Sequence, residues 1–73
     1  MPAIARTAHP LAPVLVARAS AVAQQVWPTV AGEGTVTTEV RHRRARSLYH
    51  LTHGTPSAEE ATVLREEGYS YLC

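Results

Sequence analysis

The middle of the chain decides the fold, and residues 35–53 read TVTTEVRHRRARSLYHLTH. The first six of these residues are mostly β-branched and follow a glycine, a pattern that favours a strand. Residues 47–52 carry two leucines and a tyrosine and are a suitable antiparallel partner for that strand. We therefore predict a β-hairpin with residues 41–46, RHRRAR, at its exposed tip. The side of this hairpin that faces the first helix carries Val36, Val40, Tyr49 and Leu51.

The competing interpretation of the same stretch is a helix over residues 38–53, with Gly54 as its C-terminal stop. One face of that helix would carry Val40, Arg44, Leu48 and Leu51. An arginine in the middle of an apolar face weakens this interpretation. The hairpin is therefore the favoured prediction, and the helix is its alternative.

The N-terminal part of the chain predicts an amphipathic helix over residues 11–27. Prolines at positions 10 and 13 suit its first turn, where a missing backbone N–H costs nothing, and Pro28 ends it. Apolar residues recur at spacings of three and four and form one stripe, which comprises Leu15, Ala19, Val22 and Val26.

The C-terminal part predicts a short helix followed by a strand. Ser57 and Glu60 are three residues apart and fit a capping box, and Gly68 ends the helix. Residues 69–73 then look like a strand. The predicted fold class is α+β: an arm over residues 1–9, then one small domain over residues 10–73 with an amphipathic helix, a β-hairpin, a short helix and a C-terminal strand. The alternative is a three-helix all-α arrangement.

With 73 residues, the chain is near the lower limit for a single hydrophobic core. Alanine and valine dominate its apolar residues, and the lone Cys73 cannot form an internal disulfide. Small domains of this kind usually need added stabilisation, so we predict self-association or a protein partner. The predicted oligomer interface combines the stripe of the first helix with two tyrosines of the last strand: Leu15, Ala19, Val22, Val26, Tyr69 and Tyr71.

Charge gives the strongest functional signal. The net charge is only +1, yet four of the seven basic residues lie in residues 41–46, which we call the basic run. Arginine forks bind phosphate oxygens well, so the run predicts contact with nucleic acid or another anion, with stacking from a nearby tyrosine. The predicted binding residues are Arg41, His42, Arg43, Arg44, Arg46 and Tyr49.

A second interpretation of the charge is an adaptor that docks a protein through the basic run or the acidic C-terminal helix. In this case the arginines would pair with glutamates of the same or a neighbouring subunit, namely Glu59, Glu60, Glu66 and Glu67. The first interpretation describes a small regulator or accessory factor, and the second describes an adaptor or assembly protein. The size and composition of the chain are typical of proteins encoded by phages or mobile elements.

The sequence contains no motif that indicates catalysis or metal binding. His50 and His53 would share a face on a helix but not on a strand, and no CxxC or HExxH spacing accompanies them. We predict no enzyme activity, no metal and no cofactor. The apolar stretch near the N-terminus is broken by prolines and followed by Arg18, so neither a signal peptide nor a membrane span is expected. The predicted location is the cytoplasm, with Cys73 a reduced thiol.

Overall fold

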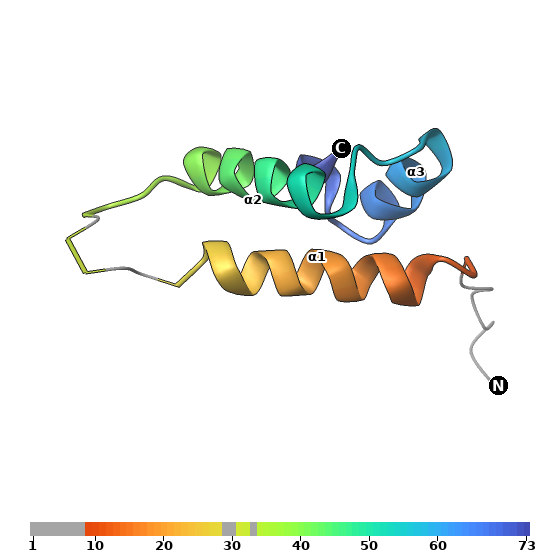
Figure 1. Cartoon of the computed structure of the whole chain (residues 1–73), viewed down its shortest axis with the longest axis horizontal. Coiled ribbons are helices and arrows are strands. Elements are labelled where there is room, and N and C mark those ends of the chain that lie inside the picture. The colour runs from red at the N-terminus through yellow and green to blue at the C-terminus, as the bar shows by residue number, and fades with distance from the viewer. Residues whose placement is uncertain (1–8, 29–30, 33) are drawn as a thin grey trace, which may run out of the picture.

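A computed structural model describes residues 9–28, 31–32 and 34–73, and Figure 1 shows their arrangement. The elements, in chain order, are α1 (Ala12–Val26), α2 (Thr38–His53), α3 (Ala58–Glu66) and the short 3₁₀-helix η1 (Ser70–Leu72). These described residues contain no strand, so the predicted α+β class is wrong and the three-helix alternative fits. The predicted N-terminal arm lies almost entirely outside the described residues.

Helix α1 confirms the first helix prediction. A proline stands in its first turn, and the Trp27 N–H donates to the Ala23 carbonyl at its C-terminal end. One face of the helix is buried along its whole length, and that face consists of Ala12, Leu15, Ala19 and Val22. The apolar stripe read from the sequence therefore packs inside the chain.

Helix α2 replaces the predicted hairpin. The Thr37 side chain accepts the Val40 N–H at 3.2 Å, so a threonine of the supposed strand instead caps a helix. Glu39 in the first turn complements the helix dipole, and Gly54, with φ of 79°, ends the helix. The basic run contains none of the glycine, proline, asparagine or aspartate residues that tight hairpin turns need, and arginine is a good helix former.

The apolar face of α2 differs from both predicted arrangements. Its buried residues are Ala45 and Tyr49, which are 0% and 1% exposed. Leu51, expected to face inward in the hairpin and in the helical alternative, is 87% exposed. Arg44, which the alternative placed in the apolar stripe, is exposed. The helical alternative was therefore correct in its bounds and wrong in its rotation.

Helix α3 forms as predicted, and the segment after it does not. The Ser57 hydroxyl accepts the Glu60 N–H while the Glu60 carboxylate accepts the Ser57 N–H, which completes the capping box. Gly68, with φ of 94°, turns the chain back, and the Tyr69 N–H donates to the Leu64 carbonyl at 2.7 Å. The predicted strand over residues 69–73 is wrong, because no strand edge is present among the described residues to pair with it.

The three helices form two layers around a small core. In Figure 1, α1 runs below α2 and α3, antiparallel to α2, and the C-terminal segment folds back between them. Helix α1 contacts both α2 and α3, and η1 contacts the same two helices from the C-terminal side. The core consists of nine residues contributed by all four elements: Ala12, Leu15, Ala19, Val22, Ala45, Tyr49, Val63, Leu64 and Leu72.

The rotation of α2 can be tested with two neighbouring truncations. Tyr49→Ala should lower the free energy of unfolding by about 3–5 kcal/mol, because it empties the largest buried site of the core. Leu51→Ala should change that free energy by less than about 0.5 kcal/mol, because the side chain is solvated. Chemical denaturation followed by circular dichroism measures both. A hairpin would make both substitutions costly, so a large loss for Leu51→Ala would contradict α2.

The capping box predicts a pH dependence of stability. The hydrogen bonds from the Ser57 backbone and hydroxyl, followed by the Arg18 charge, hold the pKa of Glu60 below its usual value of 4.5. This stabilisation is therefore fully present above the pKa of the unfolded chain and is lost as the pH falls through the lower pKa of the folded chain. Thermal melts between about pH 7 and pH 3 should show a smaller acid-side decline in Tm for Glu60→Gln than for the wild type. Parallel declines would contradict the prediction.

Candidate functional site

The helical geometry divides the basic run among different directions. Consecutive residues of an α-helix are rotated by about 100°, so four arginines within six residues cannot share one face. Arg41 and His42 are half-buried and flank the buried Ala45 side of α2. Arg43, Arg44 and Arg46 are exposed. The run therefore acts as at least two separate groups.

Arg41 is a structural residue that caps α1. Its Nη1 donates to the carbonyl oxygens of Val26 at 2.7 Å and of Trp27 at 2.5 Å. The last carbonyls of a helix lack intrahelical partners and carry the negative end of the helix dipole, so a guanidinium satisfies them well. Arg41 thereby joins the C-terminal end of α1 to the start of α2. Arg41 is therefore left out of the residues that we expect to bind an anion.

His42 belongs to an aromatic cluster that links α2 to both of its neighbours. Its ring stacks on that of Tyr71 with the centroids 4.1 Å apart and the planes 2° from parallel. Trp27 packs against this pair at a tilt, with centroid distances of 5.6 Å to His42 and 5.9 Å to Tyr71. Tyr69 contacts Tyr71 edge-on at 6.2 Å. The cluster comprises Trp27, His42, Tyr69 and Tyr71.

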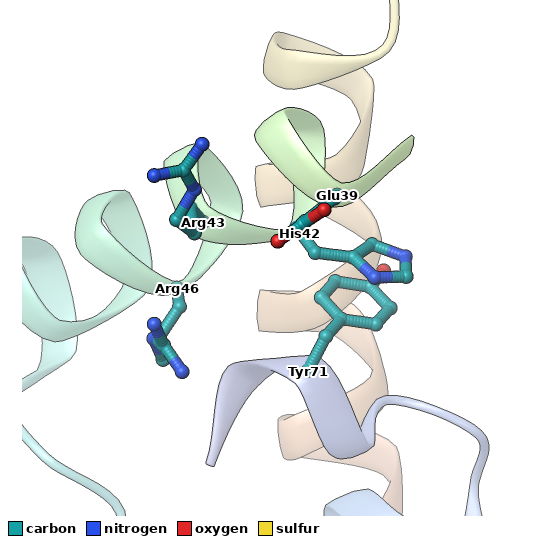
Figure 2. A pocket seen from close by; sticks show the side chains of 5 residues that line it. All are labelled: Glu39, His42, Arg43, Arg46 and Tyr71. Carbon is teal, nitrogen blue, oxygen red and sulfur yellow. The ribbon is translucent and has the colours of Figure 1, made fainter. Parts of the chain in front are cut away.

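An open pocket of about 460 Å³ lies beside this cluster. Its lining residues are Glu39, His42, Arg43, Arg46 and Tyr71, and we call it the α2 pocket. Figure 2 shows the stacked His42 and Tyr71 rings on one side of it and the Arg43 and Arg46 side chains on the other. Neither of these two arginines takes part in a hydrogen bond or ion pair with any residue that the structure describes.

The chemistry of the pocket favours an anion next to an aromatic surface. Two guanidinium groups supply paired N–H donors, which suit phosphate or carboxylate oxygens. Burial, and then the neighbouring Tyr69, raises the pKa of the Tyr71 phenol above its usual value of 10.0. The phenol therefore stays protonated at neutral pH and keeps an O–H that can donate. Glu39 places one carboxylate at the pocket.

Tyr49 is not available for binding, contrary to the sequence-based assignment. Its ring is only 1% exposed and fills the core, where it also contacts His53 at a centroid distance of 5.0 Å. His50 places a ring nitrogen 2.9 Å from the Leu72 carbonyl and so holds η1 on α2. The tyrosine that does line the pocket is Tyr71, which the sequence suggested only as an interface residue.

The sequence did not lead us to predict that Glu39 and Trp27 lie beside the predicted binding residues His42 and Arg43. Glu39 lies three residues before His42 and four before Arg43, and Arg46 follows one helical turn later. A helical projection therefore places these four residues on one side of α2. That spacing was the available signal for Glu39. No local signal places Trp27 there, because it arrives from the end of α1 through tertiary packing.

The residues predicted for an oligomer interface divide between the core and its rim. Leu15, Ala19 and Val22 are at most 3% exposed and pack within the chain itself. The other three, Val26, Tyr69 and Tyr71, are partly buried against the same core. The first-helix stripe is therefore used for folding, while self-association itself stays a prediction.

The glutamates of the first turn of α3 form ion pairs with residues outside the basic run. Glu59 lies 2.8 Å from the ring of His9, and Glu60 lies 3.8 Å from Arg18. Because the Leu11 N–H donates to Nδ1 of His9, the other ring nitrogen is the donor to Glu59. These contacts tie His9, which precedes α1, and Arg18, in the middle of α1, to the first turn of α3, and they leave Glu66 and Glu67 exposed.

Within the described ranges, no three histidine, cysteine or acidic side chains come together as a metal site, and no helix is long and apolar enough to cross a membrane. Comparisons with known protein families, curated protein sequences and solved structures gave no match.

The structural role of Arg41 can be separated from that of Arg46 by matched substitutions. Arg41→Met should lower the free energy of unfolding by about 1–2 kcal/mol, because two carbonyls at the end of α1 lose a charged donor. Arg46→Met should change it by less than about 0.5 kcal/mol. Denaturant titrations of both variants measure the difference. Equal effects would contradict the division of the basic run.

Proposed function

We propose that this chain is a small helical module that contacts the phosphate backbone of nucleic acid through the exposed face of α2. Arg43 and Arg46, both exposed, are the principal contacts. The observation that carries the proposal is the position of Arg43 and Arg46 on one side of the α2 pocket, where neither guanidinium has an ion pair among the residues that the structure describes. We expect the module to act in the cytoplasm as a regulator or accessory factor.

The distribution of the acidic residues supports a ligand from outside the chain. An internal counterpart for the basic run was expected among Glu59, Glu60 and their neighbours. Those two carboxylates instead pair with His9 and Arg18. Arg43 and Arg46 can therefore attract a polyanion over a Debye length of about 10 Å.

A salt series tests this proposal. Arg43→Gln and Arg46→Gln should each reduce the slope of log K against log salt by about 1, because each removes one phosphate contact. Arg65→Gln is the matched control, since Arg65 is an exposed arginine on α3, away from the pocket. Fluorescence anisotropy with labelled oligonucleotides measures the slopes. No binding at low salt, or an equal change for Arg65→Gln, would contradict the proposal.

The second candidate is an adaptor that docks a protein. It is favoured by two exposed apolar side chains, Leu51 at 87% and Val14 at 50%, and by the acidic surface of α3 around Glu66. Affinity purification with and without nuclease treatment distinguishes the candidates. Partners that are retained after nuclease treatment and lost in Leu51→Ser would favour the adaptor.

A further inference from the structure

We propose that the α2 pocket takes one unpaired nucleotide of a single-stranded nucleic acid, with its phosphate held by Arg43 and Arg46 and its base on the stacked rings of His42 and Tyr71. This inference rests on the proposed function and makes it specific, because it names the form of nucleic acid and the part of the nucleotide that each side of the pocket binds.

The arginine side of the pocket fits one phosphate group. Residues three apart on a helix have their Cβ atoms about 5–6 Å from each other. The guanidinium groups of Arg43 and Arg46 point away from each other in Figure 2, and rotation of the two side chains would let both reach the same phosphate oxygens. Figure 2 shows both side chains on the same side of the pocket, and both belong to the single helix α2. The helix therefore sets the spacing of the two Cβ atoms, and only side-chain rotation is needed to bring both guanidinium groups to one phosphate.

The aromatic side of the pocket fits a nucleobase. His42 and Tyr71 stack at 4.1 Å with nearly parallel planes, so a base added to this pair would continue an existing stack. Every base offers a π-face, which makes such a platform tolerant of sequence. Trp27, 38% exposed and within 6 Å of both rings, braces the pair.

The platform is held in place before any ligand binds. The Arg41 guanidinium fixes the backbone carbonyl of Trp27, and the contact of His50 with the Leu72 carbonyl fixes η1, which carries Tyr71. Leu72 itself is fully buried in the core. Since the rings are already positioned, binding loses little conformational entropy on the protein side.

Glu39 explains why a nucleotide fits better than a simple polyanion. Its carboxylate lies at the same pocket as the two arginines and repels a second phosphate there. A base edge has amino or imino N–H groups that a carboxylate accepts. The volume of about 460 Å³ is within the usual range for small ligands. In a duplex both faces of a base are covered by its neighbours, so only an unpaired base can use this platform.

The test compares three oligonucleotides with equal numbers of phosphates: an intact single strand, the same strand with abasic sites, and a duplex. The intact strand should bind at least about 5-fold more tightly than the abasic strand, which corresponds to the lower end of a base–aromatic stack of about 1–3 kcal/mol. It should also bind more tightly than the duplex. Trp27, the only tryptophan, should change its emission with the intact strand alone.

Tyr71 variants identify the platform. Tyr71→Phe keeps the ring and should preserve the preference for the intact strand, whereas Tyr71→Leu should abolish it while the salt dependence persists. Circular dichroism melts confirm that each variant is folded, and His42→Leu serves as a second test if Tyr71→Leu does not fold. Equal binding of the intact, abasic and duplex ligands would overturn the nucleotide pocket and leave the backbone contact standing. Absence of binding to all three at low salt would overturn both.

Discussion

The rotation of α2 about its own axis is the constraint on which the rest of this structure depends. Ala45 and Tyr49 are the residues that α2 buries, and Tyr49 is among the largest fully buried side chains of the chain. A core this small cannot leave such a ring in water, because few other side chains contribute comparable apolar area. Once this face is turned inward, helix geometry turns Arg43 and Arg46 outward.

The same constraint joins the core to the α2 pocket. In η1, Leu72 is buried against the helices while the preceding residue, Tyr71, stacks on His42 at the pocket. Neighbouring residues of a 3₁₀-helix are rotated by about 120°, so one short segment supplies both a core residue and a site residue. Arg41 links the fold to the pocket from the side of α1. Its hydrogen bonds to the carbonyls of Val26 and Trp27 hold Trp27 beside the His42 and Tyr71 rings.

Local signals in the sequence predicted α1 and α3 well. Prolines, an apolar stripe and the Ser57–Glu60 box each act over a few residues, so tertiary packing did not override them. The middle failed because threonine and valine favour strands, whereas Thr37 is also a good helix cap. The charge of the basic run directed the site prediction to α2, but separating Arg41 from Arg43 required the rotation of α2, which only the packed structure defines.

Arg43 and Arg46 are one turn apart on the exposed side of α2, and Glu39, four residues before Arg43, lies at the same pocket. Like charges one turn apart on a helix destabilise it by about 0.2–0.5 kcal/mol, and Glu39 can offset this only for Arg43, with which it forms no ion pair among the described residues. Arg41 and Arg18 show that this chain can pair its cations where structure requires it. The anionic ligand proposed above would supply the negative charge that these two guanidinium groups do not find in an ion pair among the described residues.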